Sequence, residues 1–279
     1  MKITFLGAGV FGTALSNVAK YNGHEVKLYD PIKYPKTTLS SAISGADLVV
    51  YAAPSEKIDE ILPQLDQDTP LICASKGFLS AKPFARFKKF SVLSGAAFAH
   101  DIENILNPSR ADSQTTIIKN IVLTATSDLS EQIFSTENIT IEYTDDIIGV
   151  LLCGALKNIY AIGAGIYGGD EVSRTYLENV ITEMITILQN NHAKKETLLL
   201  SCGATDLVLT CSPRSRNFSF GRALKSQDKS LLHEFVSKNT IEGLSLIKSI
   251  DKFSDFVIPD SATILVDIIK VVKDAKEDL

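Results

Sequence analysis

The feature that most constrains this chain is a run of glycines directly after its first strand-like segment. Residues 2–6 form a short, mostly apolar run, and Gly7-Ala-Gly9-Val-Phe-Gly12 follows without a gap. The residues after it carry apolar side chains at helical spacing, so the run opens a helix. Glycines in this order allow a tight turn, a close approach to the backbone, and close packing of helix on strand. The chain is therefore expected to begin with a βαβ unit.

A second strand-like segment, residues 25–29, is followed by Asp30, 18 residues after Gly12. A helix that begins at the glycine run offers free N–H groups and its positive dipole end to a pyrophosphate. A carboxylate at Asp30 can accept hydrogen bonds from a ribose and would repel a 2′-phosphate. Some βαβ units with glycine turns bind nothing, but loop, strand and acid together favour a dinucleotide site. NAD is the expected cofactor, preferred over NADP.

The rest of the chain divides by its hydrophobic pattern at about Thr144. Before it, short apolar runs alternate with helical or turn-like segments, which is typical of a parallel sheet covered on both faces. After it, apolar residues repeat at helical spacing. The predicted fold class is α/β, with an N-terminal Rossmann-type doubly wound sheet in residues 1–144 and a C-terminal all-α domain in residues 145–279. The expected strands are 2–6, 25–29, 48–53, 71–74, 91–93, 121–125 and 139–143, and the clearest helical faces are those of residues 177–188 and 265–272.

Charge and hydropathy exclude several classes of partner. Lys and Arg total 28 against 33 Asp and Glu, a net charge of -5 without long like-charged runs. We therefore expect no nucleic acid partner. Residues 147–168 are apolar enough to resemble a membrane span, but Lys157 near the centre favours a buried helix and no stable membrane insertion. An acidic metabolite would need several cations gathered at one place.

The cysteines and histidines indicate compartment and metal content. The four cysteines form no CxxC pair and lie in apolar segments, where a thiol packs as a small hydrophobe. Met1 leads at once into the first strand, which leaves no room for a signal segment. We expect a cytoplasmic protein, with a homodimer as the default assembly of an enzyme. The histidines have no metal-ligand spacing, so no metal site is predicted.

Three charged positions stand out from their surroundings. Lys157 lies between apolar residues on both sides, where loss of hydration lowers the pKa of an ammonium group and suits it to proton exchange. A lysine in such a run can instead reach solvent or pair with a carboxylate. Asp206, embedded in another apolar run, is the candidate to orient Lys157. Lys76 follows the strand 71–74, at the edge where such sheets bind ligands, although an ordinary loop lysine is an equal alternative.

A further polar segment of the sequence is Ser215-Arg216-Asn217. A planar guanidinium beside an amide and a hydroxyl suits recognition of a phosphate or carboxylate. An exposed Arg-Asn pair is also common in loops that bind nothing.

Together these segments resemble the NAD(P)-dependent glycerol-3-phosphate dehydrogenases of the bacterial type, over nearly the whole chain. The most specific matches are Leu152-Cys-Gly-Ala-Leu-Lys-Asn158 and Asp206-Leu-Val-Leu-Thr-Cys211. Further matches are Gly7-Ala-Gly-Val-Phe-Gly-Thr-Ala-Leu15, Ser75-Lys-Gly77, Ser94-Gly95 with Phe98-Ala99, Ser215-Arg-Asn217 with Phe220-Gly221, and Glu242-Gly243.

The resemblance implies an oxidoreductase of glycerol-3-phosphate metabolism that reversibly reduces dihydroxyacetone phosphate to sn-glycerol 3-phosphate, for phospholipid biosynthesis. It implies that Lys157 donates and accepts the proton, that Lys76 contacts cofactor and substrate, and that Asp206 holds the substrate and Lys157 in register. The substrate, a small phosphorylated triose, would be bound by Lys76, Gly95, Lys157, Asn158, Asp206, Thr210, Ser215, Arg216 and Asn217. The cofactor would be bound by Gly7, Gly9, Val10, Phe11, Gly12, Asp30, Lys76, Ala99, Arg216 and Glu242.

Some residues depart from the family pattern. Ala96-Ala97 stands where bacterial members usually have proline and a small hydroxyl residue, and residues 202–205 replace a glycine-rich approach to Asp206. The chain is also shorter than a typical member. These departures leave two alternatives open: a dehydrogenase of another small hydroxy acid or sugar phosphate, and a catalytically weakened NADH-binding protein.

Overall fold

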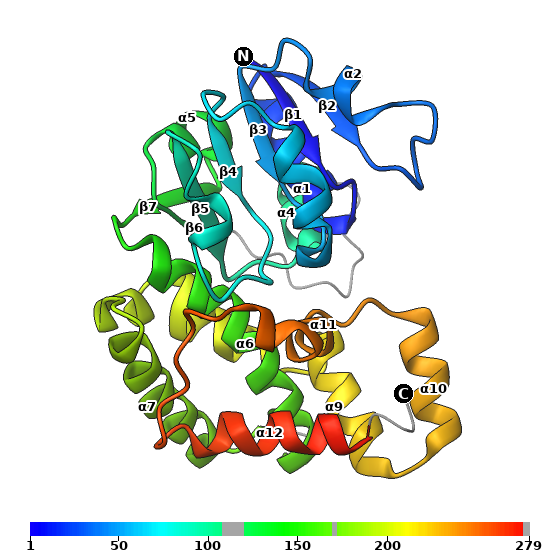
Figure 1. The fold of residues 1–279 in the computed structure, drawn as a ribbon, viewed down its shortest axis with the longest axis vertical. Coiled ribbons are helices and arrows are strands. Elements are labelled where there is room, and N and C mark those ends of the chain that lie inside the picture. Colours follow the sequence, from blue (N-terminus) through cyan, green and yellow to red (C-terminus); the bar gives the residue numbers. More distant parts are fainter. Residues whose placement is uncertain (108–119, 169–171, 276–279) are drawn as a thin grey trace. The chain divides into compact units, whose positions relative to one another are not determined.

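The computed structural model describes residues 1–107, 120–168 and 172–275. The chain forms two compact units (Figure 1). The first combines residues 1–75 with 81–147 and contains the sheet, whereas the second combines residues 76–80 with 148–279 and is helical. The predicted fold class, a Rossmann-type sheet followed by a helical region, is confirmed.

In its described residues, the first unit has a seven-stranded sheet of order β2-β1-β3-β4-β5-β6-β7. The strands are β1 Lys2–Leu6, β2 Glu25–Tyr29, β3 Leu48–Tyr51, β4 Leu71–Cys73, β5 Phe90–Gly95, β6 Ile121–Ala125 and β7 Ile139–Tyr143. The helices are α1 Val10–Tyr21, α2 Leu39–Ile43, α3 Ile58–Ile61, α4 Ala99–Leu106 and α5 Leu129–Phe134. Every predicted strand is present: four have the predicted bounds, and the other three differ by one or two residues at one or both ends.

The expectation of a parallel sheet is wrong for the last two strands. Strands β1 to β5 are parallel, but β6 runs antiparallel to β5, with Leu93 opposite Ala125 and Gly95 opposite Leu123. Strand β7 is parallel to β6. A buried apolar run reads the same in either chain direction, so its pattern does not encode the direction of the strand.

A single apolar core joins one face of the sheet to α1, α4 and α5. It includes Phe5 of β1, Leu15 of α1, Ile102 of α4 and Phe134 of α5, each at most 1% exposed. Burial of side chains of this size contributes roughly 2 kcal/mol each, so this layer fixes the start of α1 against the end of β1.

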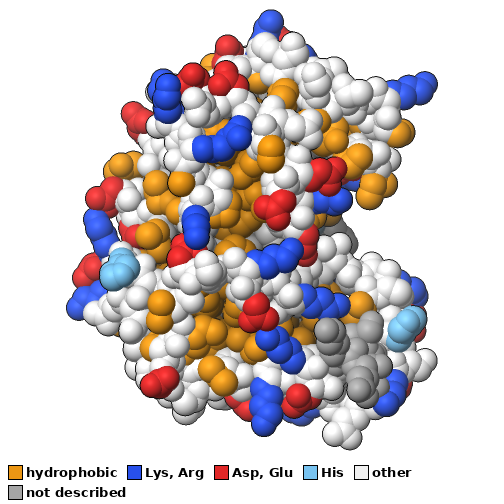
Figure 2. Space-filling view, viewed as in Figure 1, with side chains coloured by type: hydrophobic (Ala, Val, Ile, Leu, Met, Phe, Trp, Pro, Cys, Tyr) orange, Lys and Arg blue, Asp and Glu red, His pale blue; other side chains and the backbone are white. Residues whose placement is uncertain are grey.

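On the face drawn in Figure 2, charged side chains of both signs are interspersed with apolar ones.

The second unit is built from helices of very different length. They are α6 Ile147–Tyr167, α7 Arg174–Asn190, α8 Asp206–Thr210, α9 Arg216–Ser226, α10 Lys229–Lys238, α11 Glu242–Ser249 and α12 Thr263–Asp274. A 3-10 helix at Lys195–Leu199 and a π-helical turn at Ser201–Thr205 lead into α8. The predicted face of α12, Leu265, Ile268, Ile269 and Val272, is buried.

Helix α6 is the centre of the second unit. It is long and apolar enough to cross a membrane, but 89% of its most apolar window is buried inside the protein. A Cβ at Gly165 would lie 2.1 Å from the Phe218 carbonyl oxygen, so glycine is what allows α9 to approach α6 this closely. The prediction of a buried core helix is confirmed, and Lys157 within it is only 4% exposed.

A buried carboxylate ties α7 to α6 and α12. Glu183 is 6% exposed and accepts the Tyr160 hydroxyl at 2.7 Å. It also accepts the backbone N–H groups of Ile264 and Leu265, at the start of α12, at 2.9 and 2.8 Å. Burial and the nearby Glu183 raise the pKa of Tyr160, which therefore stays a hydrogen-bond donor.

We expect Glu183→Ala to lower the free energy of unfolding by about 3 kcal/mol, because three buried donors lose their acceptor. Glu178→Ala is the control: Glu178 lies on the same helix, pairs with Arg174 at the surface, and should contribute within about 0.5 kcal/mol. Urea denaturation measures both. Equal stability of the two variants would contradict this assignment.

Candidate functional site

The glycine loop has two glycines that the fold requires and one that it does not. Gly7 has a φ of 106°, and a Cβ there would lie 2.5 Å from the Ala53 nitrogen. A Cβ on Gly12 would lie 2.2 Å from the Gly7 carbonyl oxygen. Gly9 differs, because a Cβ there would meet no atom of the described residues within 4 Å. The space beside Gly9, at the N-terminus of α1, fits the close approach of a pyrophosphate.

Asp30 is bonded to the same loop. Its Oδ2 accepts the Ala8 N–H at 3.2 Å, and its Oδ1 accepts the N–H groups of Ile32 and Lys33, both at 3.0 Å. A carboxylate has about four acceptor positions, so one on Oδ2 remains for a ribose hydroxyl. Lys33 donates from Nζ to the Ala8 carbonyl oxygen at 2.5 Å. The sequence reasoning missed this lysine, which places a cation on the loop that carries Asp30.

The other predicted residues of the first unit lie at element ends. Val10 and Phe11 open α1, with Val10 exposed and Phe11 half-buried. Gly95 ends β5 with a φ of 149°, and a Cβ there would lie 2.9 Å from the Leu123 Cα, so packing against β6 requires glycine. Ala99 opens α4.

The second unit gathers the predicted charged residues around one carboxylate. Asp206 is 1% exposed; its Oδ1 accepts Lys157 Nζ at 2.5 Å and its Oδ2 accepts Lys76 Nζ at 3.1 Å. Lys157 Nζ also donates to the Thr210 hydroxyl at 2.9 Å. Asp206 and Thr210 are both on α8, one turn apart, which is why a short helix can supply both groups. In the described residues, no three His, Cys, Asp or Glu side chains are grouped to hold a metal ion.

The two lysines of this cluster differ in protonation. Burial lowers the pKa of Lys157 to about 8; the nearby Lys76 acts in the same direction, against the opposing charge of Asp206. Burial also lowers the pKa of Lys76, but Asp206 and Glu242 more than offset it, and the net change is upward. Lys76 is therefore a permanent cation, whereas Lys157 can gain and lose a proton close to neutral pH.

A chain of amide side chains lies next to the cluster. Asn158 donates from Nδ2 to Glu242 Oε2 at 3.1 Å, and its Oδ1 accepts Asn217 Nδ2 at 2.9 Å. Asn217 Oδ1 in turn accepts the Gly243 N–H, at the start of α11, at 2.9 Å. These bonds fix Glu242 relative to α6 and α9. They require that each amide group point its Nδ2 and its Oδ1 at the partners named here.

Helix α9 begins beside these amides. Ser215 is its N-cap and is 4% exposed, and Arg216 is its first residue and is exposed. The first turn of this helix, which contains no acidic residue, combines the positive dipole end with a guanidinium. Such a helix end is suited to a phosphate.

The structure thus brings the predicted residues together in two groups. Gly7, Gly9, Gly12 and Asp30 meet at the start of α1 in the first unit. In the second unit, one hydrogen-bonded cluster contains Lys76, Lys157, Asp206 and Thr210. A neighbouring cluster contains Asn158, Asn217 and Glu242, and the charge of Glu242 acts on both lysines. Lys76 belongs to the helical unit even though it follows β4 closely, which the sequence reading did not anticipate.

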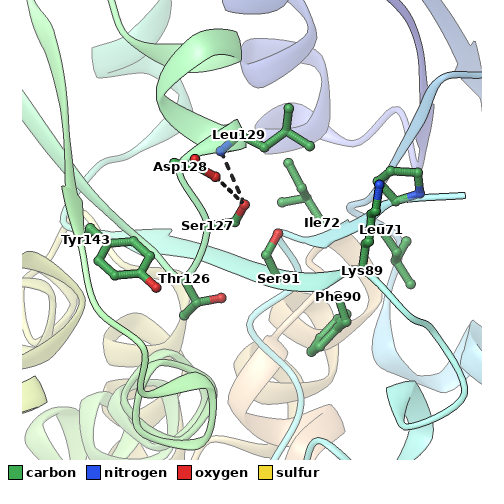
Figure 3. A pocket seen from close by; sticks show the side chains of 11 residues that line it. Leu71, Ile72, Lys89, Phe90, Ser91, Thr126, Ser127, Asp128, Leu129 and Tyr143 are labelled. Carbon is green, nitrogen blue, oxygen red and sulfur yellow. Dashed lines mark hydrogen bonds between the residues drawn. The ribbon is translucent and has the colours of Figure 1, made fainter.

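A separate cavity of about 620 Å³ lies in the first unit and contains none of the predicted site residues. It opens beside the amino ends of β4 and β5 (Figure 3), where Ser127 accepts the Leu129 N–H at 3.2 Å. The ligand edge of the parallel strands is the opposite one, at the carboxyl ends, so this cavity does not lie where such sheets bind their ligands.

A mostly parallel sheet with a glycine loop and an acid after its second strand is the arrangement of a Rossmann-type dinucleotide-binding unit. Residues 146–277 match the family profile described as NAD-dependent glycerol-3-phosphate dehydrogenase C-terminus. A glycerol-3-phosphate dehydrogenase [NAD(P)+] of Oceanobacillus iheyensis is 28% identical over an alignment that covers 91% of this chain and 84% of the relative.

Solved structures agree with the sequence comparison. The glycerol-3-phosphate dehydrogenase of Coxiella burnetii is similar with a TM-score of 0.76 and 25% identity, over 99% of this chain and 98% of the other. A ketopantoate reductase from Ralstonia eutropha shares the fold, with a TM-score of 0.56 and 17% identity, over 99% and 100% of the two chains. The helical part of the chain thus matches the C-terminal region of the NAD-dependent glycerol-3-phosphate dehydrogenases, and nearly the whole chain is similar to distant proteins of that family.

The contrast between Gly9 and Gly12 gives a paired prediction. Gly9→Ala should change the free energy of unfolding by less than about 0.5 kcal/mol, because its methyl group meets open space, yet weaken NADH binding at least about tenfold. Gly12→Ala should lower stability by about 2 kcal/mol, since its methyl group overlaps a backbone oxygen. Urea denaturation and titration calorimetry measure the two effects. Wild-type NADH affinity in Gly9→Ala would show that the space beside Gly9 is not used.

Proposed function

We propose that this protein reduces dihydroxyacetone phosphate to sn-glycerol 3-phosphate with NADH, and catalyses the reverse oxidation. The observation that carries the proposal is the pair of lysines on one buried carboxylate, since one lysine is permanently charged and the other titrates near neutral pH. Carbonyl reduction needs both functions: a fixed charge that polarises the carbonyl oxygen and an acid that protonates it. Similarity to the glycerol-3-phosphate dehydrogenases supports this chemistry.

The proton moves through Lys157 in this proposal. The cofactor, when bound, supplies the hydride to the carbonyl carbon. The Lys157 ammonium gives its proton to the carbonyl oxygen, so the ketone becomes an alcohol and Lys157 becomes neutral. Asp206 and the Thr210 hydroxyl hold Nζ in place during this transfer, because both are bonded to it. In the oxidation, neutral Lys157 takes the alcohol proton.

The phosphate of the substrate is assigned to the start of α9. Ser215, Arg216 and Asn217 lie there on consecutive residues, with the free N–H groups of the helix N-terminus. Asn158 supports Asn217 through their hydrogen bond, and Gly95 would contribute a backbone contact. With Lys76 and Lys157, the guanidinium of Arg216 supplies a third cation to a phosphate dianion within an acidic protein.

The cofactor is assigned to the glycine loop, with Asp30 as the residue that favours NAD. The one acceptor position left on Asp30 suits a ribose hydroxyl, and its charge opposes a 2′-phosphate. The positive charge of Lys33 on the same loop partly offsets the repulsion between Asp30 and a 2′-phosphate. NADH is therefore the preferred cofactor, and NADPH is used less well. Val10, Phe11, Ala99, Arg216 and Glu242 would complete the binding site.

We further propose a cytoplasmic homodimeric enzyme that supplies glycerol 3-phosphate for phospholipid biosynthesis. Residues 1–144 would be the dinucleotide-binding domain and residues 145–279 the substrate domain. The buried thiols of all four cysteines fit a reducing compartment.

An absorbance assay of NADH and NADPH oxidation tests reaction, substrate and cofactor together. Dihydroxyacetone phosphate should be among the best substrates in a panel of triose phosphates, ketopantoate and other small keto acids, and kcat/KM should be higher with NADH. Ala97 lacks the hydroxyl group that family members usually carry at this position, which leaves room for a different substrate. Turnover of another hydroxy acid or sugar phosphate in place of dihydroxyacetone phosphate would favour the alternative that the protein is a dehydrogenase of that substrate. Tight NADH binding without turnover of any panel member would favour a cofactor-binding protein.

Lys157→Ala should reduce kcat about 10³-fold while leaving the Kd for NADH largely unchanged. In the wild type, reduction should slow as the pH rises through about 8, because it needs protonated Lys157, and oxidation should speed up over the same range. Lys248→Ala, an exposed lysine on α11, is the matched control and should keep both profiles. A Lys157→Ala enzyme with wild-type turnover would rule out this role.

A further inference from the structure

The short segment that carries Lys76 is anchored on the helical unit by contacts that the proposed chemistry does not use. Residues 76–80 belong to this unit, and Phe78 and Leu79 are 1% and 2% exposed. Ser80, 4% exposed, donates its hydroxyl to Asp255 Oδ2 at 2.5 Å. The segment is therefore held at Ser80 by a carboxylate from a distant part of the sequence.

Asp255 is itself held in place by a loop that α7 fixes. It lies in a turn in which the Phe256 N–H donates to the Phe253 carbonyl oxygen at 3.0 Å. The next residue, Val257, donates its N–H to Asn191 Oδ1 and accepts Asn191 Nδ2, both at 2.8 Å. Asn191 is 7% exposed and also donates to the Ile187 carbonyl oxygen of α7. Hydrogen bonds at Val257 and at Asp255, two residues apart in the same loop, thus tie the end of α7 to Ser80.

The other end of the segment meets the reaction site. Lys76 Nζ contacts Asp206, and only three residues separate Lys76 from Ser80. A chain this short with both ends held has few conformations, so the anchor at Ser80 limits where the Lys76 ammonium can lie.

We propose that Asp255 is a positioning residue that, through Ser80, holds the segment 76–80 so that Lys76 is presented to Asp206. The inference rests on the proposed function in one respect, since it treats the Lys76–Asp206–Lys157 cluster as the reaction site. Asp255 is hydrogen-bonded to Ser80, and no motif of the sequence marks Asp255.

The position of Lys76 also acts on Lys157. The charged or titratable groups that influence Lys157 are Asp206 on α8, Lys76, Glu242 on α11 and, next to α8, Cys211. Lys76 is the one cation among them and lowers the pKa of Lys157. Displacement of Lys76 would therefore raise the pKa of Lys157 and move its titration to higher pH.

Asp255→Ala and Asp255→Asn test the proposal, with Asp251→Ala as the control because Asp251 pairs with Lys273 on α12 instead. In Asp255→Ala, kcat/KM for dihydroxyacetone phosphate should fall about tenfold and the pH profile should shift to higher pH. Amide hydrogen exchange at residues 77–80 should become at least about tenfold faster. The Asn variant, whose side-chain oxygen can still accept from Ser80, should restore most of the activity, the pH profile and the slow exchange.

Two results would overturn the proposal. One is unchanged exchange at residues 77–80 in Asp255→Ala. The other is a loss of activity that follows overall stability, with an unmoved pH profile and no rescue by Asn, since a merely structural role predicts that pattern. If the wild type fails to reduce dihydroxyacetone phosphate, the proposed function fails, and the exchange difference between the Ala and Asn variants still decides whether Asp255 holds the segment.

Discussion

The chemistry of the helical unit depends on one buried carboxylate between two ammonium groups. An unpaired charge as deeply buried as Asp206 would be strongly destabilising, and the two lysines offset that cost. The same geometry divides their roles, because deeper burial and the neighbouring cation lower the pKa of Lys157 while Lys76 stays charged. Glu242 acts on both lysines as a second anion, so the cation not balanced within this group is Arg216 at the start of α9.

The glycine loop shows how structural and functional requirements divide between similar residues. The packing of β1, α1 and the end of β3 needs Gly7 and Gly12, whereas no contact among the described residues requires glycine at position 9. Asp30 is likewise partly structural, since three backbone N–H groups already use it. A ligand at this loop meets a surface that the fold has already ordered, which lowers the entropy lost on binding.

Much of this arrangement could be predicted from the sequence, because it depends on local pattern. The strands, the buried α6 and the apolar face of α12 follow from hydrophobic periodicity, and the glycine loop with Asp30 follows from spacing. The direction of β6 could not be predicted, since a buried apolar run has the same pattern in either strand direction. Lys33, Glu183 and Asp255 were missed because each is an ordinary charged residue in its own segment, and its importance comes from a partner far away in sequence.

The sequence by itself determined the fold class, the dinucleotide-type loop and the identity of the charged residues in apolar surroundings, because burial and turn chemistry depend on nearby residues. Only the tertiary structure decided that Lys76 and Lys157 share Asp206, that Lys76 belongs to the helical unit, and that Asn158 and Asn217 order Glu242. Such contacts join residues up to 130 positions apart in the sequence. They cannot be predicted from the sequence because a hydrogen bond depends on distance in space, which only the folded chain defines.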